Sequence, residues 1–148
     1  MTAEIDEADA RVRKSFARQS LMATMGAAVA AVRLGEVEIV LPYSDRILQQ
    51  HGFVHGGAIA SIADIACGYA ALTVMPREAA VLTTEFKMNL LAPAKGERLR
   101  AVGRVIRNGR KLVVTLADVF AEEGAARKQV ALMTATMMVV AAEGSLRD

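Results

Sequence analysis

The hydrophobic residues of this chain follow a helical period at the start and a strand period soon after. Five apolar residues recur at helical spacing among mixed charges: Ile5, Ala8, Val12, Phe16 and Leu21. This spacing predicts an amphipathic N-terminal helix within residues 1–22. Residues 27–43 then alternate and are interrupted at Gly35, which predicts two short strands joined by a turn.

The most apolar stretch of the chain runs from Gly56 to Met75 and contains one charged residue, Asp64. Its length approaches that of a membrane span, but its many alanines and glycines and a central carboxylate argue against one, since a charge at mid-bilayer costs several kcal/mol. We therefore predict a buried central helix. Pro76 ends it, because proline cannot extend a helix.

Residues after 79 alternate with period two and predict four antiparallel strands. In the first, Leu82, Phe86, Met88 and Leu90 share one parity and are expected to face the core, whereas Thr83 falls on the polar parity. Strands over residues 96–107 and 110–120 flank Asn108-Gly109, a pair that predicts a type I′ hairpin. A turn at 122–126 leads to a last strand over 127–140, and residues 143–148 are predicted to form a tail.

The order of elements predicts an α+β fold in which one long helix is wrapped by a curved antiparallel sheet of about six strands. The 148 residues suit one domain spanning 1–148. Charged residues nearly cancel to a net charge of +2, which does not indicate nucleic-acid binding. A single cysteine and a start without a basic-then-apolar signal favour the reducing cytoplasm, and no membrane attachment is expected.

The segment 55–64, HGGAIASIAD, resembles the H-G-G motif, with an Asp nine residues after the His, of the PaaI-like acyl-CoA thioesterases in the hotdog-fold superfamily. The likeness continues through TTEFKMNLLAPA at 83–94, RNGRK at 107–111 and the strand order, over about 37–140. It implies hydrolysis of acyl-CoA to a carboxylate and free CoA without a metal or organic cofactor. It also implies a homodimer with its sites at the interface. A dimer of dimers is expected, and the sequence leaves the choice between dimer and tetramer and the arrangement of the dimers open.

The residues themselves support this chemistry. Gly56 and Gly57 stand where the buried helix begins, so the Gly56 N–H is suited to stabilise the negative charge that develops on a thioester carbonyl. Asp64 would act as nucleophile or as the general base that activates water. Eight residues separate Gly56 from Asp64, a rise of about 12 Å in a helix. We therefore expect Gly56 of one subunit to pair with Asp64 of its partner across a two-fold axis.

Four polar residues are further candidates near these two groups. His55 would position substrate or water or assist the departing thiolate, or it would simply cap the helix. Gln49 stands where the resemblance implies an Asn or Gln that binds the attacking water or the nucleophile; Asn is more common there, and Gln50 is the alternate. The resemblance also implies that Thr83 holds the water; its place on the polar parity of the strand leaves an ordinary strand threonine as the alternative.

The remaining candidates would bind substrate. His51 and Ser61 flank the start of the helix. Arg107, Arg110 and Lys111 border the Asn-Gly hairpin and would meet the phosphates of coenzyme A, or would only solubilise the hairpin.

Two classes of function compete. A Ser-His-Asp hydrolase is disfavoured because both histidines precede the buried helix and no G-x-S-x-G motif occurs. The combination of Asp64, Gly56 and His55 favours a thioesterase over a non-catalytic acyl-CoA-binding protein. The acyl group, whether aromatic, medium or long, is left open by the sequence.

Overall fold

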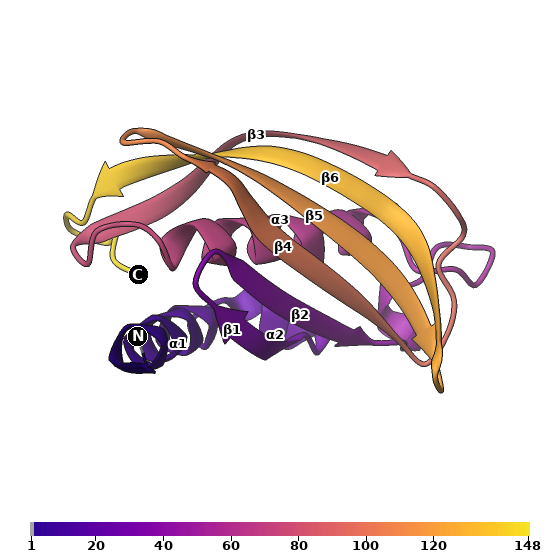
Figure 1. Cartoon of the computed structure of the whole chain (residues 1–148). Helices are drawn as coiled ribbons and strands as arrows, with labels where there is room; N and C mark the ends of the chain where they lie inside the picture. The colour runs from indigo at the N-terminus through magenta and orange to yellow at the C-terminus, as the bar shows by residue number, and fades with distance from the viewer. Residues whose placement is uncertain (1) are drawn as a thin grey trace.

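A single antiparallel sheet curves around one long helix in the computed structural model, which describes residues 2–148 (Figure 1). The elements in chain order are α1 (Thr2–Phe16), α2 (Ser20–Met25), β1 (Ala28–Arg33), β2 (Glu36–Pro42), the 3-10 turn η1 (Asp45–Ile47), α3 (Gly56–Leu72), β3 (Ala79–Leu90), β4 (Arg98–Asn108), β5 (Leu112–Glu123) and β6 (Ala126–Ala141). The six strands lie in the order β1-β2-β4-β5-β6-β3, with every neighbouring pair antiparallel. The predicted α+β architecture is confirmed.

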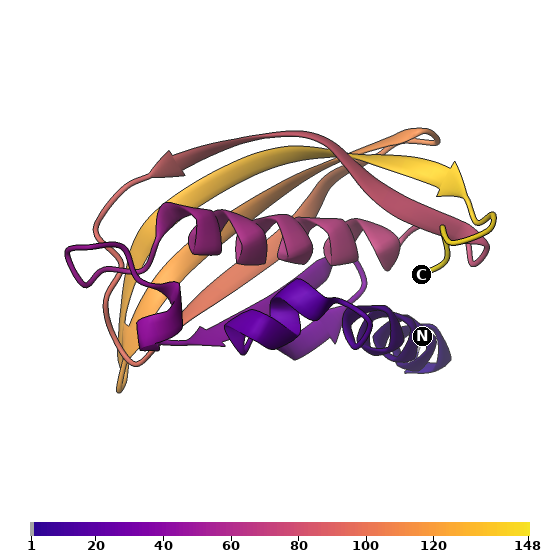
Figure 2. The same cartoon turned by 180° about the vertical axis from the view of Figure 1, so that it is seen from behind.

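Helix α3 lies in the concave face of the sheet, as Figure 2 shows from behind. Close packing is possible because alanines such as Ala63, Ala66 and Ala70 form its buried side and because β4 carries Gly103 opposite them. A Cβ on Gly103 would lie 2.3 Å from the Ala66 carbonyl, so a larger residue would push α3 off the sheet. Among residues 2–148, α3 included, no helix combines the length and hydropathy of a membrane span.

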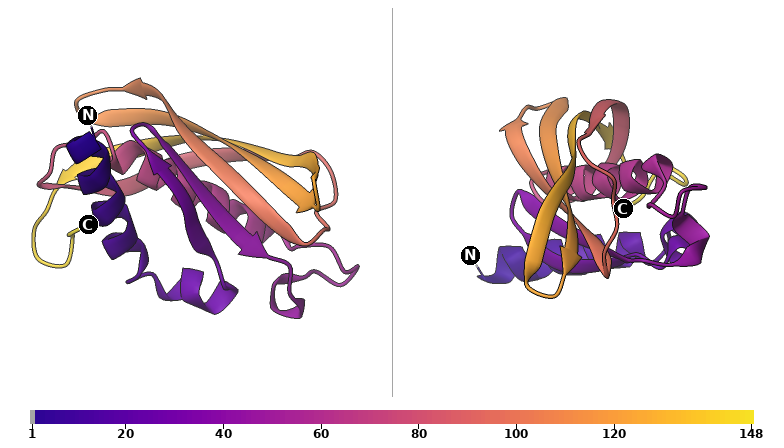
Figure 3. Two further views of the ribbon diagram at one scale, coloured as in Figure 1. Left: turned by 60° about the horizontal axis from the view of Figure 1, so that its bottom comes forward. Right: turned by 90° about the vertical axis from the view of Figure 1, so that its right-hand side faces the viewer.

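The predicted N-terminal helix is two helices, and its Met1 lies outside the described residues. The chain turns after Phe16, and α2 ends at Gly26, whose φ of +82° is the left-handed conformation that glycine favours. The second helix places Met22 and Met25 in the core. Figure 3 shows α1 beside β1, and Arg11 donates hydrogen bonds to the carbonyls of Leu72 and Met75 at the end of α3.

Strand β3 departs from the predicted alternation at a bulge. Its register against β6 slips between Thr83 and Glu85. Before the slip, Thr83 pairs with buried Met137 and Leu82 pairs with exposed Met138. The inward position predicted for Leu82 is therefore wrong, and Thr83 faces α3 instead, because one extra residue reverses the faces of a strand. Beyond the bulge Phe86, Met88 and Leu90 share one face as predicted. The expectation that they lie in the core is wrong for Phe86 and Leu90, which are 49% and 57% exposed because β3 is an edge strand with no neighbour on one side.

The β4–β5 hairpin also differs from the expectation. A type I′ turn needs positive φ at both central residues, but no non-glycine residue in the described chain has positive φ and Gly109 is not among the glycines that do. The Gly109 N–H instead bonds the Leu112 carbonyl at 3.1 Å. A Cβ on Gly109 would lie 2.4 Å from that oxygen, so glycine is needed here for close approach.

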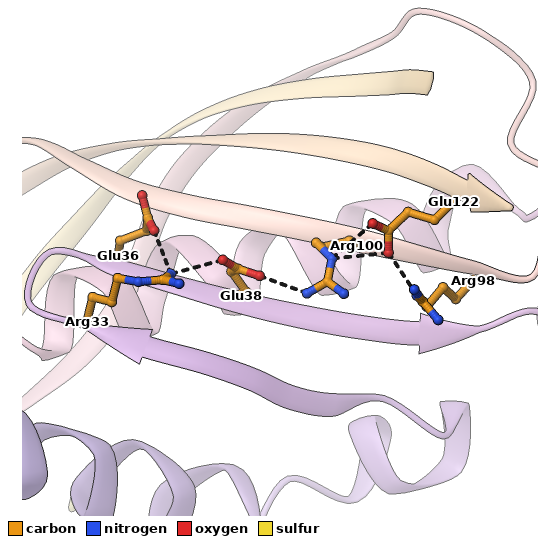
Figure 4. A network of polar contacts seen from close by, with 6 residues as sticks. All are labelled: Arg33, Glu36, Glu38, Arg98, Arg100 and Glu122. Carbon is orange, nitrogen blue, oxygen red and sulfur yellow. Dashed lines mark hydrogen bonds and ion pairs between the residues drawn. The ribbon is translucent and has the colours of Figure 1, made fainter. Parts of the chain in front are cut away.

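The outer face of the sheet carries a network of six charges across neighbouring strands (Figure 4). Arg100 contacts Glu38 at 2.7 Å and Glu122 at 3.1 Å, while Arg33 and Arg98 bond the same two carboxylates from the ends. Partial burial alone would raise the pKa of Glu38 and Glu122, but hydrogen bonds from these arginines outweigh burial and lower both pKa values. These arginines are thus engaged within the sheet.

Candidate active site

The first turn of α3 presents one unused backbone donor. His55 is the N-cap residue, and its Nδ1 accepts a hydrogen bond from the Gly57 N–H at 2.8 Å. Within residues 2–148 no hydrogen bond uses the Gly56 N–H. Of the two predicted glycines, Gly56 therefore keeps a free N–H at the positive end of the helix.

A hollow of about 450 Å³ opens beside this donor. Gln49, His51 and Gly56 line it on one side, and Leu90 and Pro93 line it on the other. Gln49 faces the hollow while its Oε1 accepts a hydrogen bond from the His51 N–H. The structure thus gathers three predicted residues here, whereas Gln50 is exposed and lies outside the lining.

Asp64 lies in a separate hollow of about 90 Å³ between α3 and β3. Its Oδ1 accepts a hydrogen bond of 2.7 Å from the Thr83 hydroxyl, which the bulge in β3 turns toward the helix. Burial raises the pKa of Asp64 above its usual range, and the bond from Thr83, which favours the carboxylate, counteracts part of that rise. A raised pKa makes the carboxylate a stronger base, which suits a group that accepts a proton from water or attacks a carbonyl.

The other predicted residues lie apart from these two groups. Ser61 donates to the Gly57 carbonyl at 2.8 Å within its own helix. Arg107, Arg110 and Lys111 are exposed on the β4–β5 hairpin, and no ion pair of the described chain includes them. That hairpin lies near the C-terminal end of α3, whereas Gly56 is at the N-terminal end of the helix (Figure 1).

The site offers neither a second nucleophile nor a metal-binding cluster. Cys67 is fully buried, and burial raises the pKa of its thiol to about 12, so it carries no thiolate at neutral pH. Across residues 2–148 no three His, Cys, Asp or Glu side chains are grouped as metal ligands.

Three residues near Asp64 were not found from the sequence. Gln19, Tyr69 and Asp148 line its hollow, although they lie in the α1–α2 connection, on α3 and in the predicted tail. Pattern analysis has no signal for Gln19 and Asp148, because only the folded chain brings such distant segments together, and Tyr69 reads as an ordinary apolar residue of the buried helix.

A curved sheet around one helix, with a free N–H at the helix start and a half-buried aspartate two turns later, defines a hotdog-fold thioesterase. The sequence profile of the thioesterase superfamily matches residues 51–127, and the chain belongs to this family. It is accordingly a hydrolase.

Relatives agree with this placement. A candidate esterase of Halobacterium salinarum is 30% identical over 78% of this chain and 83% of its own. The crystal structure of a thioesterase family protein from Silicibacter pomeroyi is 46% identical, has a TM-score of 0.88 and covers 90% of this chain and 98% of its own. The PaaI protein of the Escherichia coli phenylacetic acid degradation operon, at 19% identity, shares the fold with a TM-score of 0.82, covering 92% and 95% of the two chains.

The bond between Thr83 and Asp64 predicts how activity depends on pH. Thr83→Val removes a hydrogen bond that favours the carboxylate, so the pKa of Asp64 rises. A carboxylate that acts as base or nucleophile must be ionised, so if Asp64 has this role we expect activity to be lost at a higher pH on acidification than in the native protein. The measurement is the acid limb of kcat/KM against pH.

A matched control is the neighbouring Thr84→Val. The Thr84 hydroxyl donates to the Thr136 carbonyl at 3.0 Å and does not touch Asp64. Its acid limb should coincide with that of the native protein. Identical limbs in all three proteins would contradict the role assigned to Thr83.

Proposed function

We propose that the protein is an acyl-CoA thioesterase that acts as a homodimer and releases a carboxylate and free CoA. One observation carries the proposal: a free Gly56 N–H and the Asp64 carboxylate lie on one helix but face two different hollows. Their separation along α3, about 12 Å, is too large for one thioester carbonyl. Two chains related by a two-fold axis would complete each other's site.

In this mechanism the thioester oxygen accepts the Gly56 N–H of one subunit. The partner subunit's Asp64 either takes a proton from the attacking water or attacks the carbonyl carbon itself, forming an anhydride that water then cleaves. Negative charge grows on the oxygen as the carbonyl is attacked, and the N–H at the helix terminus stabilises it. The intermediate collapses with breakage of the C–S bond, and CoA leaves as a thiolate.

Gln49 and His55 have supporting roles in this proposal. The Gln49 amide, beside Gly56, would orient the water. Because His55 Nδ1 accepts the Gly57 N–H, the neutral ring carries its proton on Nε2 and could donate it toward the departing sulfur. His55 thus combines the capping role with the catalytic one, which the sequence left as alternatives.

Strand β3 is the proposed dimer interface. It is a twelve-residue strand at the free edge of the sheet, and Phe86 and Leu90 on it are 49% and 57% exposed. A long apolar edge strand is a template for pairing with another strand. Antiparallel pairing of two β3 strands would also bring the partner's β4–β5 hairpin toward Gly56, where Arg107, Arg110 and Lys111 could meet CoA phosphates.

The interface can be tested with Phe86→Asp. Burying a carboxylate in place of a phenyl ring is expected to weaken the dimer about a hundredfold or more. Analytical ultracentrifugation over a range of concentrations measures the effect. Leu112→Asp is the control, since Leu112 is similarly exposed at 47% but lies on β5, away from the free edge. Equal dimer stability in both variants would contradict the interface.

The function itself is tested by release of CoA thiol from a panel of aliphatic and aromatic acyl-CoAs. We expect steady turnover of at least one member without added metal. Calorimetric titration with the same compounds identifies the alternative: tight binding with no thiol release would make the protein a non-catalytic acyl-CoA-binding protein. Pairing of two dimers and a cytoplasmic location stay predictions.

A further inference from the structure

The hollow beside Asp64 has walls that would hold an acyl chain and an end that would stop it. Gly68, one turn beyond Asp64 on α3, leaves room beside the carboxylate, while Ile65 and Val81 add apolar surface. A chain attached to a carbonyl at Asp64 would therefore run along α3 toward its C-terminal end.

Gln19, Tyr69 and Asp148 line that end of the hollow, and Ser15 lies behind them and links Tyr69 to Asp148. Gln19 Nε2 donates to the Tyr69 hydroxyl at 2.9 Å, Tyr69 donates to Ser15 Oγ at 3.1 Å, and Ser15 donates to Asp148 Oδ1 at 2.8 Å. The direction of the relay is fixed because a carboxylate only accepts. Asp148 Oδ2 accepts the Val81 N–H at 2.8 Å, which anchors the relay to β3.

This end wall is held together by hydrogen bonds, and its inner members are buried. Tyr69 and Ser15 are only 2% and 4% exposed. The segment after β6 returns toward α1 to place Asp148, as Figures 1 and 2 show. Moving one member of this hydrogen-bonded chain would break several bonds, so displacing the wall to admit a longer ligand would be costly.

The size of the hollow indicates what fits. Its volume of about 90 Å³ in one chain is smaller than the roughly 150 Å³ cavity that accommodates benzene. A ring would not enter it, whereas a few methylene groups would. The polar atoms at its end would also be left without water by a long alkyl chain.

We propose that the relay of Gln19, Tyr69, Ser15 and Asp148 is the end wall of the acyl pocket and restricts the enzyme to short aliphatic acyl groups. This inference rests on the proposed thioesterase function. Gln19 and Asp148 act here as specificity-determining residues and take no part in the chemical step.

The test is the dependence of kcat/KM on acyl length, from acetyl-CoA to dodecanoyl-CoA, with phenylacetyl-CoA as the aromatic probe. The native protein should prefer chains of up to about four carbons, because about 90 Å³ holds only a few methylene groups beyond the carbonyl. Gln19→Ala and Asp148→Ala each remove atoms from the end wall, and each should raise kcat/KM for octanoyl-CoA relative to butanoyl-CoA about tenfold. The gain should appear in KM, with kcat for butanoyl-CoA unchanged.

Matched controls are Gln129→Ala, whose side chain bonds Asp118 on the outer face, and Asp45→Ala in the exposed turn η1. Both should keep the native length profile. A native preference for long or aromatic groups, or profiles unchanged in Gln19→Ala and Asp148→Ala, would overturn the inference. If either Gln19→Ala or Asp148→Ala fails to fold, the other variant still tests the inference.

The same comparison separates this inference from the proposed function. Dissociation constants for each acyl-CoA are measured by calorimetry in an Asp64→Asn background, with and without Gln19→Ala. Absence of turnover in the native protein, together with a Gln19-dependent shift in the dissociation constants, would refute the thioesterase function and support the end wall. Turnover without such a shift would support the thioesterase function and refute the end wall.

Discussion

Asp64→Asn is expected to lower the rate of CoA release about a thousandfold or more. The substitution keeps the shape of the side chain and an oxygen that can accept the Thr83 hydroxyl, but it removes the basic and nucleophilic carboxylate. KM for the acyl-CoA should change little, since the carboxylate acts on the reacting atoms. The measurement is steady-state thiol release with the best substrate of the panel.

The same variant should not lose stability. Burial raises the pKa of Asp64, so its ionised form disfavours the fold, and this penalty grows as the pH rises from the usual aspartate range through the raised pKa. Asp64→Asn removes the penalty, and its thermal midpoint at neutral pH should equal or exceed that of the native protein. Such a result is typical of a residue kept for activity.

Asp45→Asn, in an exposed turn, is the control and should leave turnover unchanged. Retention of more than about a tenth of native turnover by Asp64→Asn would contradict any role for this carboxylate in the chemical step. Loss of turnover together with loss of the dimer would leave the catalytic role without support.

Long periodic segments could be predicted from the sequence because burial imposes their period directly. The uncharged run gave α3 and its isolated carboxylate, and alternation after residue 79 gave four strands. The bulge at Thr83 could not be predicted, since a bulge depends on pairing with β6 and leaves no mark in composition. Its consequence falls on the site, because it turns Thr83 toward Asp64.

The candidate site shows the same division. Gly56, His55 and Asp64 were found because helix starts and lone buried charges are local features. Gln19 and Asp148 were not, since their position beside Asp64 depends on how α1 and the segment after β6 pack against α3. The candidate catalytic residues could therefore be predicted from local sequence features. The residues that line the end of the hollow could be identified only from the folded structure.

Gly56→Pro is expected to reduce kcat about a hundredfold to a thousandfold by removing the N–H donor. Proline is well tolerated in the first turn of a helix, and His55, at φ −60° and ψ 137°, already has the conformation that a following proline requires. No hydrogen bond within residues 2–148 is lost. KM should change less than kcat, because the donor mainly stabilises charge that develops in the transition state.

Gly56→Ala is the matched control. Both variants add a Cβ that meets Leu90 Cδ1 at 3.1 Å, and the exposed Leu90 side chain can move aside. Alanine differs from proline in keeping the backbone N–H. Gly56→Ala should therefore retain most of the native kcat. An equal loss in the two variants would show that the Cβ and not the missing donor is responsible.

Mixing Gly56→Pro with Asp64→Asn then tests whether two chains share each site. A mixed dimer joins the intact Gly56 of one chain to the intact Asp64 of the other, so one of its two sites is complete. With random exchange of subunits, half of the dimers are mixed, and about a quarter of native activity should return. If Gly56 and Asp64 instead served one site within a single chain, no mixture of these two inactive proteins would recover activity.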